Sequence, residues 1–408
     1  MRVLLITDSY PPEIRSASLL MAEMAEGFRD RGCEVCVLTS SPRYNLAQWP
    51  LAGRKRLFYR ETADGIEVIR THTLPIHNVG HLRRGLGQVF LPAIFSLPTP
   101  AIRRPDATVV YSPPLTLGLA AWAVKVSRGT PFIFNVQDIF PQNAVDLGAL
   151  RNPRIIAAFR AIERFVYRHA DAVTVHSNAN RNVLIASGAD PAKLSVIPNW
   201  VDAEKYERAR GRPVPLADPT IIEGKFVALF AGVMGYAQDF QVVIDAAKAL
   251  KGDPDVLFLL VGDGPRGAWV RREAALLPNV IVHPFIQGEE YPALLAAADC
   301  GLVTLEKSMK TPVVPSKILG YMAAGKPVVG SLNRESEAVA IIEDAGCGFA
   351  RGVETGEDLA ERISRLRRDP ELAREMGAAG RECVRRSFSP RACLDAYFEL
   401  ARSLRRPQ

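Results

Sequence analysis

The segment TPVVPSKILGYMAAGKPVVGSL (Thr311–Leu332) predicts a short helix followed directly by a buried strand. Pro315, Ser316 and Lys317 stand where the helix would begin, and a glycine and a lysine follow its end. The first backbone N–H groups of a helix have no partner within the helix, so an anion can complete them. We therefore expect an anion-binding helix start within an α/β fold, and the rest of the chain has to indicate which anion it takes.

Short β-branched runs alternate with helical patterns nearly from end to end, which is typical of parallel sheets flanked by helices. A polar, Pro-rich segment, RARGRPVPLADPT, interrupts this alternation, and the pattern restarts at KFVALFAGVMG. We expect two doubly wound, Rossmann-like domains at residues 1–200 and 201–387, with a last amphipathic helix (388–408) returning to the first domain. Because ligands bind at the carboxyl ends of such strands, the site is expected in a central cleft that both domains face.

The length of 408 residues suits two domains, and 48% hydrophobic against 23% charged residues is the composition of a soluble globular enzyme. Met1 leads directly into a strand and loop without the pattern of a signal peptide, so a cytoplasmic protein is expected. Six cysteines indicate reduced thiols rather than a disulfide framework. Cys33 and Cys36 form a C-x-x-C, but it lies in an alternating strand pattern and no second pair completes a zinc site.

The basic excess lies in the first half of the chain. Residues 1–200 hold 23 Lys and Arg against 15 Asp and Glu, whereas the remainder is nearly neutral. An anionic membrane, an anionic acceptor, nucleic acid or a basic surface that aids solubility could each explain this excess. The uncharged run Gly85–Ile102 contains three prolines and is bracketed by arginines, so it predicts either an apolar element at the membrane surface or a helix packed on its own sheet, and not a transmembrane helix.

Two glycine-containing loops follow expected strands of the second half. In FAGVMGYAQ, Gly232 and Gly235 would allow a phosphate to approach the backbone closely, although a tight turn needed only for packing would look the same. In LLVGDGP, Gly262 begins a similar loop. The fingerprint G-x-G-x-x-G is incomplete here, which disfavours a dinucleotide-dependent dehydrogenase.

Seven short motifs then occur in one order along nearly the whole chain. They are YPPE, QDIFP, IPNWVD, FAGVMGYAQ, VGDGP, NVIVHPF and PSKILGYMAAGKPVV. In this order and context the chain resembles the family 4 glycosyltransferases of the GT-B fold, particularly the branch of fucosamine and exopolysaccharide transferases. The resemblance implies transfer of a sugar from a nucleotide diphosphate donor, with retention of anomeric configuration, without a metal or other cofactor.

The resemblance also implies roles for individual residues of the second domain. The anion at the helix start would be the donor diphosphate, and Lys317 would stabilise the negative charge that grows as the sugar leaves. The base would lie near His283 and Phe285, although His283 could equally pack locally. Further donor-binding residues would be Gly232, Val233, Met234, Gly235, Gly262, Glu306, Pro315 and Ser316.

The chain departs from the family at two glutamate positions, which hold Pro312 and Gly320. The second glutamate binds the ribose in many relatives, and Glu306 is the nearest carboxylate that could replace it. The usual basic pair of the glycine loop is also missing. Lys307, Lys310 and Lys317 are the cations that could supply its charge.

The first domain is expected to bind the acceptor. FNVQDIFPQ places Gln137 and Asp138 at the carboxyl end of a strand, where many relatives have a histidine beside an acid. Asp138 would position or deprotonate the acceptor hydroxyl, or would simply cap the next turn. Ser16 and Ala17 replace the Gly-Gly pair that relatives often have in the loop after the first strand.

No metal site is expected. The six histidines show no ligand spacing, and Asp253 and Asp255 of GDPDV imitate a D-x-D motif but precede a strand as an ordinary polar turn would.

The sequence therefore predicts a transferase that adds one sugar, N-acetylated amino or deoxy, from a UDP donor to a surface polysaccharide. The predicted acceptor is an undecaprenyl-diphosphate-linked saccharide at the cytoplasmic face of the inner membrane, with peripheral contact to anionic lipid. A nucleotide-sugar epimerase of the same fold and a binding protein without turnover remain alternatives. Nucleic acid is not an expected partner, because the chain shows no recognition motif.

Overall fold

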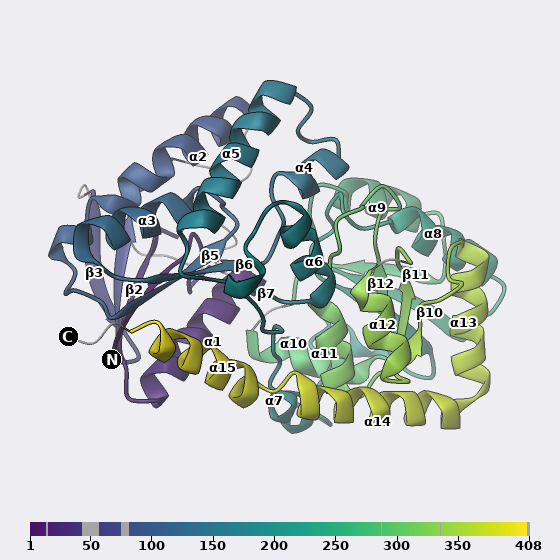
Figure 1. Ribbon diagram of the computed structural model, residues 1–408. Helices are drawn as coiled ribbons and strands as arrows, with labels where there is room; N and C mark the ends of the chain where they lie inside the picture. The colour runs from purple at the N-terminus through teal and green to yellow at the C-terminus, as the bar shows by residue number, and fades with distance from the viewer. Residues whose placement is uncertain (14, 43–56, 75–80, 287, 335, 406–408) are drawn as a thin grey trace. The chain divides into compact units, whose positions relative to one another are not determined.

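The computed structural model describes residues 1–13, 15–42, 57–74, 81–286, 288–334 and 336–405, with only the backbone for 81–86. The chain divides into two compact units (Figure 1). Unit 1 holds residues 1–199 and 391–408, and unit 2 holds residues 200–390. Each unit is an α/β body with its own sheet, so the prediction of two Rossmann-like domains is confirmed.

Unit 1 contains an eight-stranded sheet in the order β3-β4-β2-β1-β5-β6-β7-β8. All neighbouring strands are parallel except β3, which pairs antiparallel with β4. The strands are β1 (Arg2–Ile6), β2 (Glu34–Ser40), β3 (Phe58–Ala63), β4 (Ile66–Thr71), β5 (Ala107–Ser112), β6 (Phe132–Val136), β7 (Ala172–Val175) and β8 (Leu194–Val196). The sequence did not predict β3, although Asp64 and Gly65, both with positive φ, form the tight hairpin turn that Asp-Gly favours.

Helices cover both faces of the unit 1 sheet (Figure 1). In the view shown, α1 and α15 lie on one face, whereas α2, α3 and α5 lie on the other. The helices are α1 (Ser16–Asp30), α2 (His81–Ser96), α3 (Leu117–Arg128), α4 (Gln142–Asp146), α5 (Pro153–His169), α6 (Asn178–Ala186) and α15 (Pro390–Ser403). The last helix returns to unit 1, where Tyr397 is buried and its hydroxyl lies 3.3 Å from that of Thr174 on β7.

The uncharged run that begins at Gly85 forms most of α2, and Pro92 lies inside this helix without ending it. Leu91 and Phe95 are buried in the core of unit 1, while Val89 and Phe90 point outward and are more than half exposed. One side of this helix therefore packs on its own domain, as one of the two expectations had it, and another side is exposed and apolar. Contact with a membrane stays a prediction. No helix of the described residues is long and apolar enough to cross a membrane.

Unit 2 contains a six-stranded, wholly parallel sheet in the order β11-β10-β9-β12-β13-β14. The strands are β9 (Phe226–Ala231), β10 (Val256–Val261), β11 (Val280–His283), β12 (Cys300–Thr304), β13 (Val328–Ser331) and β14 (Gly348–Phe349). The helices are α7 (Ala203–Arg208), α8 (Phe240–Ala249), α9 (Gly267–Ala274), α10 (Tyr291–Ala297), α11 (Lys317–Ala324), α12 (Glu337–Asp344), α13 (Gly356–Arg368) and α14 (Pro370–Ser387).

The core of unit 2 lies on both faces of this sheet. Every residue of β10 is buried, as expected for a parallel strand covered on both sides. One hydrophobic cluster joins the sheet to α8, α9 and α13, and a second joins it to α7, α10, α11 and α14. Because all six strands are parallel, their carboxyl ends lie at one edge of the sheet. The loops that follow these ends carry expected donor-binding residues.

Candidate functional site

The candidate site of unit 2 lies where the strand order reverses, between β9 and β12. These strands pair only at Ala228 with Cys300 and at Leu229 with Gly301. Beyond Leu229 they separate, so the carboxyl end of β9 loses its neighbour on that side. Such a reversal is the usual ligand position in doubly wound sheets.

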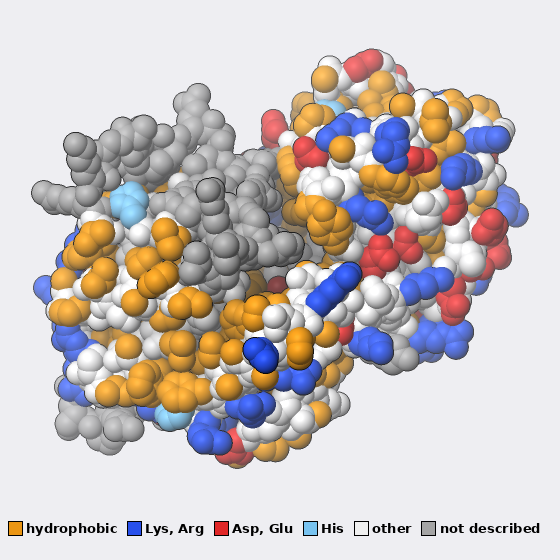
Figure 2. Space-filling view, turned by 90° about the horizontal axis from the view of Figure 1, so that it is seen from above, with side chains coloured by type: hydrophobic (Ala, Val, Ile, Leu, Met, Phe, Trp, Pro, Cys, Tyr) orange, Lys and Arg blue, Asp and Glu red, His pale blue; other side chains and the backbone are white. Residues whose placement is uncertain are grey.

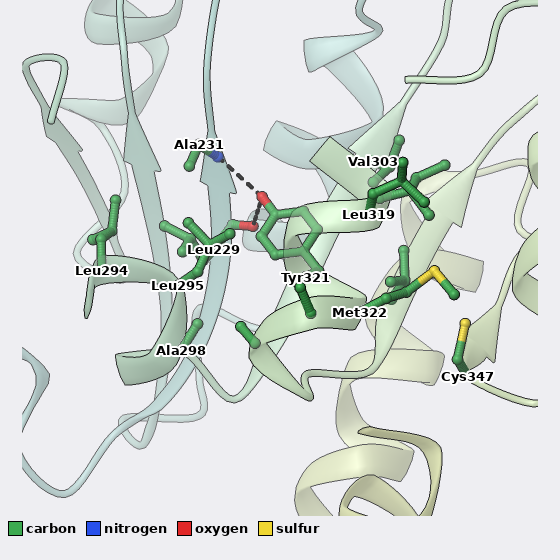
Figure 3. Close-up of a cluster of buried hydrophobic side chains, with 14 of the residues drawn as sticks. Leu229, Ala231, Leu294, Leu295, Ala298, Val303, Leu319, Tyr321, Met322 and Cys347 are labelled. Atoms are coloured by element: carbon green, nitrogen blue, oxygen red, sulfur yellow. Dashed lines mark hydrogen bonds between the residues drawn. The ribbon is translucent and has the colours of Figure 1, made fainter. Parts of the chain in front are cut away.

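Tyr321 of α11 occupies the point where the two strands separate (Figure 3). Its hydroxyl donates to the carbonyl of Leu229 at 2.9 Å and accepts from the amide of Ala231 at 3.1 Å. Gly301 makes room for the ring, because a Cβ at this position would lie 2.2 Å from it. The side chain thus replaces the missing strand partner and anchors α11 to the end of β9.

The two glycine loops pack directly against each other. A Cβ on Gly262 would lie 1.9 Å from the carbonyl oxygen of Gly232, and one on Gly264 would lie 2.6 Å from that of Met234. All three glycines have φ between +143° and +152°, which side chains rarely adopt. The loop geometry consequently depends on glycine at Gly232, Gly262 and Gly264.

Most amides of the first glycine loop are already bonded. Gly232 donates to Val261 at 2.9 Å, Met234 to Asp263 at 2.8 Å, and Gly235 to the side chain of Gln238 at 2.9 Å. Among the four predicted residues of this loop, only Val233 has an amide without an acceptor among the described residues, and its side chain is exposed. Of the four predicted residues, Val233 therefore offers the free N–H group, whereas the side chain of Met234 belongs to the core.

Lys317, the first residue of α11, places its ammonium group beside the first loop. Nζ lies 3.8 Å from the centroid of the Phe230 ring and 3.7 Å from the position that a Cβ on Gly232 would take. No carboxylate pairs with it in the part of the chain that the structure describes. Burial lowers the pKa of Lys317 to about 7, so this cation is desolvated without a counter-ion.

The start of α11 adds further free donors next to this lysine. The amides of Ser316 and Lys317 have no acceptor among the described residues, while that of Ile318 donates to Pro315 at 3.1 Å. Ser316 is exposed and its hydroxyl makes no capping bond. The helix start thus offers free donors to an anion, and anion binding there stays a prediction.

Arg266 is a second cation at this edge that the sequence reasoning missed. It follows the second glycine loop, stacks 5.3 Å from the Trp269 ring and approaches Glu306 at 3.4 Å. Its Nε is buried without a hydrogen-bond partner among the described residues. Burial and the nearby Asp239 raise the pKa of Glu306 despite the arginine. Glu306 is therefore held by Arg266, while Lys307 and Lys310 are exposed.

A side chain at Gly320, where many relatives have the ribose-binding glutamate, would crowd two neighbouring side chains. A Cβ there would lie 3.1 Å from Leu295 and 3.3 Å from the hydroxyl of Tyr206.

The residues predicted to lie near the base follow β11, where Nδ1 of His283 contacts the carbonyl of Pro284 at 2.9 Å and Phe285 is half-buried. His283 thus interacts locally.

The expected acceptor residues belong to unit 1. The carboxylate of Asp138, directly after β6, has no hydrogen-bond or ion-pair partner among the described residues, and burial raises its pKa. Tyr111 is close enough that burial, and then the charge of Asp138, raise the tyrosine pKa. Asp138 is therefore a partly buried carboxylate available to a ligand.

The neighbouring predictions need two corrections. Gln137 bonds to Asn135 at 2.9 Å and to Asn199 at 2.7 Å, so its amide supports the fold rather than being free for an acceptor. Ser16 and Ala17 do not lie in a loop, because they form the first turn of α1. Without the family's Gly-Gly pair, this segment has no residue that disfavours helix.

Asp253 and Asp255 have a structural role. Both bind Arg367, each at 2.6 Å, in the turn before β10. In the described part of the chain, no three His, Cys, Asp or Glu side chains gather as a metal site would require.

Together, the unit 2 residues suit a phosphorylated ligand. The Lys317 ammonium lies beside the first glycine loop, Val233 of this loop has a free amide, and the start of α11 has two more. A diphosphate could accept from such donors.

The family comparison agrees with this geometry. Residues 19–200 match the Glycosyl transferase 4-like domain, and residues 216–383 match the Glycosyl transferases group 1 domain. The chain belongs to the family 4 glycosyltransferases with the GT-B fold, which confirms the predicted resemblance. These two domain families define a transferase, so an epimerase is the less favoured alternative.

Two curated proteins and one solved structure are examples of what the chain is similar to. The probable glycosyltransferase WbjE of Pseudomonas aeruginosa is 30% identical over 279 residues, which cover 66% of this chain and 68% of WbjE. The putative colanic acid biosynthesis glycosyl transferase WcaI of Escherichia coli is 24% identical over 80% of this chain and 82% of its own. The structure of HepE from Anabaena, solved with UDP-glucose, has a TM-score of 0.70 at 18% identity, covering 99% of this chain and 100% of HepE.

Proposed function

We propose that this glycosyltransferase transfers a sugar from a UDP-sugar to an undecaprenyl-diphosphate-linked saccharide during synthesis of a surface polysaccharide. The sugar would be an N-acetylated amino or deoxy sugar, and the protein would act at the cytoplasmic face of the membrane. The name of WcaI, a relative over most of the chain, supports the polysaccharide role. The UDP-glucose complex of HepE, which shares the fold, supports the choice of nucleotide.

The observation that carries this proposal is the Lys317 ammonium group, desolvated against Phe230 with no counter-ion among the described residues. A diphosphate beside it would also accept from the amides of Val233 and Ser316. These donors bind more strongly as negative charge develops, so they favour departure of the diphosphate over its ground state.

The proposed reaction retains the configuration at the anomeric carbon and needs no metal ion. The bond between this carbon and the β-phosphate oxygen breaks, and a bond to the acceptor oxygen forms. The acceptor proton passes to Asp138 or to the departing phosphate. Lys317 and the helix start take the place of a cation that would otherwise neutralise the leaving group.

Calorimetric titration with UDP, GDP, dTDP and ADP tests the donor site. We expect selective binding of UDP that is weakened at least about tenfold in Lys317→Ala, because a charge-assisted contact is lost. The matched control is Lys251→Ala, an exposed lysine of unit 2 outside the proposed site. If no nucleotide binds, or if both variants bind equally well, the donor-site assignment is wrong.

Turnover tests the enzymatic part of the proposal. With lipid-linked saccharide acceptors and UDP-sugars, activity should persist in excess EDTA. Activity that EDTA abolishes and Mg²⁺ restores would refute metal independence. UDP binding without turnover on any acceptor would instead favour a nucleotide-sugar-binding protein that lacks activity.

A further inference from the structure

Unit 1 carries an open apolar groove that the donor site does not use. Helix α3 packs against α2 on one side and α5 on the other, and the groove runs above it with a volume of about 490 Å³. It is lined mainly by Pro92 and Ala93 of α2, Leu119 and Trp122 of α3, and Ile162 and Phe165 of α5. The hydroxyl of Ser96, also in the lining, donates to the carbonyl of Pro92 at 2.7 Å, so it does not need a ligand.

Exposed apolar side chains extend the groove along the same helix faces. Val89 of α2, Val126 of α3 and Ile155 of α5 are 65%, 67% and 45% exposed. Each is separated by three, four or seven positions from groove residues of its own helix, a spacing that places them on one face. Figure 2 shows hydrophobic side chains gathered over this part of unit 1. Exposed apolar areas of this extent indicate an interaction surface.

The three helices around the groove also carry the basic excess of the protein. Together α2, α3 and α5 contain eight Lys and Arg and one acidic residue, a net +7 that equals the formal charge of the whole chain. The acidic residue, Glu163, is buried and accepts from the Tyr167 hydroxyl at 3.1 Å, and burial raises its pKa. Lys125 of α3 pairs with Asp171 at 2.7 Å, so the described cations without a carboxylate partner lie mainly on α5.

The arginines of α5 are available to an anionic partner. Arg154, Arg160, Arg164 and Arg168 are exposed, and none forms an ion pair with a carboxylate of the described residues. Arg154 and Arg168 are each seven positions from Ala161 of the groove, which places them on its side of α5. Arg160 lies on another side of the helix and donates to the side chain of Gln142 at 3.1 Å. Apolar side chains bordered by uncompensated cations match the two parts of an anionic lipid surface, its acyl chains and its headgroups.

From this match we infer that the α2–α3–α5 face is the surface by which the protein docks on an anionic phospholipid bilayer. Val89 and Phe90 enter the acyl boundary, the groove receives part of an acyl chain, and the α5 arginines contact headgroup phosphates. The inference specifies the membrane contact of the proposed function by assigning it to particular helices. It does not depend on the donor site, which belongs to unit 2.

Vesicle flotation of the full chain tests this inference. Vesicles of phosphatidylcholine and phosphatidylglycerol, two parts to one, should bind the protein, whereas phosphatidylcholine alone should bind it weakly. Removing both charges in Arg154→Gln/Arg168→Gln should reduce partitioning about 25-fold, since each basic residue contributes about fivefold. Arg368→Gln/Arg386→Gln, two exposed arginines of unit 2, removes the same charge and should change partitioning by less than about threefold.

A second measurement examines the groove itself. Bromine on the acyl chains should quench tryptophan fluorescence in the bound protein, and Trp122→Phe should remove most of this quenching while preserving binding. Phe90→Ser should reduce partitioning about tenfold, because its half-exposed ring no longer enters the bilayer.

Three results would overturn the inference. They are absence of binding to the anionic vesicles, equal losses in the α5 and control variants, and a concentration-dependent dimer that Phe90→Ser disperses in the absence of vesicle binding. UDP titration of each variant distinguishes failure of the docking surface from failure of the proposed donor site. Normal UDP affinity with failed flotation would reject the docking surface alone, and failed UDP binding with normal flotation would reject the donor site alone.

Discussion

At the residue scale, the proposed role of Lys317 rests on a charge whose burial is unfavourable in the unliganded protein. Its ammonium group lies against Phe230 and beside Gly232, where little water or opposite charge compensates it. A lysine in such surroundings loses its proton more readily than one in water. An arriving phosphate reverses this effect, because the attraction between the two charges favours the protonated form.

We predict that the affinity for a UDP-sugar falls as the pH rises above about 7, the pKa of Lys317 in the unliganded protein. Below this pH the lysine is already protonated and binding needs no proton. Above it, binding must take up a proton, so the dissociation constant rises by up to about tenfold per pH unit until the pKa of the complex is reached. Calorimetry from about pH 6 to about pH 9 in buffers of different ionisation enthalpy measures both quantities.

Lys317→Arg is the control, because its guanidinium stays protonated over this range. Its pH profile should be flat even if its affinity is lower. The same slope in wild type and Lys317→Arg would show that another group titrates. A UDP-sugar is preferable to UDP here, since its phosphates carry no proton that titrates in this range.

In unit 1, Asp138 is the proposed catalytic residue whose pKa is also shifted by burial. Its carboxylate has no partner among the described residues, and burial raises its pKa. We predict that Asp138→Asn lowers kcat by about a hundredfold or more, the range for loss of a general base, while the affinity for UDP is unchanged. Asp146→Asn, on α4, should alter kcat less than about threefold. Steady-state kinetics with saturating donor would contradict the role if the two variants behaved alike.

At the scale of elements, the two glycine loops act as one structural unit. Gly262 touches the carbonyl of Gly232 so closely that any side chain would collide with backbone. Hydrogen bonds from Gly232 to Val261 and from Met234 to Asp263 join the loops further. Movement of either loop would therefore displace the free amide of Val233.

We predict that Gly262→Ala disrupts this unit. The added Cβ would lie 1.9 Å from the Gly232 oxygen, and φ at this position is +145°, so the backbone must move. The expected cost is about 1–3 kcal/mol of unfolding free energy, together with at least a tenfold loss of UDP affinity. Gly252→Ala is a matched control, because nothing lies within 4 Å of its Cβ position. Urea denaturation and calorimetry would contradict the argument if Gly262→Ala were as harmless as the control.

The buried parallel strands were predictable because continuous apolar runs such as β10 carry the signal in their own residues. The half-exposed β3 was missed, since its residues give a weaker pattern and only the Asp-Gly turn marks it. The residues of the candidate site also fall into a group that could be predicted from local sequence and a group that could not. The helix start at Ser316 follows from local rules, whereas Arg266 near Glu306 depends on contacts between distant segments.

The bonding of Gln137 to Asn199 and the packing of Met234 were not predictable for the same reason. A motif places a residue in a loop, but its hydrogen bonds and burial depend on what the fold brings beside it. The departure at Gly320 was visible in the sequence, whereas the close approach of Leu295 and Tyr206 to this position was not.

At the scale of the whole molecule, the chain enters unit 1 twice. After forming unit 2 it returns as α15, where Leu394 packs against Gly27 of α1 and Arg31 pairs with Asp395 at 2.6 Å. Tyr397 is 1% exposed and reaches Thr174 on β7. The stability of the first unit consequently depends on the last residues of the sequence.

We predict that Tyr397→Ala destabilises unit 1 by about 3–5 kcal/mol, the usual cost of removing a large buried aromatic side chain. Because Tyr397 packs within unit 1, the loss should be confined there, and Tyr397→Phe, which removes only the hydroxyl, should cost about 1 kcal/mol. Hydrogen exchange should show reduced protection in α1 and β7, with β9 and β10 unchanged and UDP affinity preserved. Equal loss of protection in both units would mean that they unfold together, and unchanged protection of α1 would mean that α15 contributes nothing to the core of unit 1.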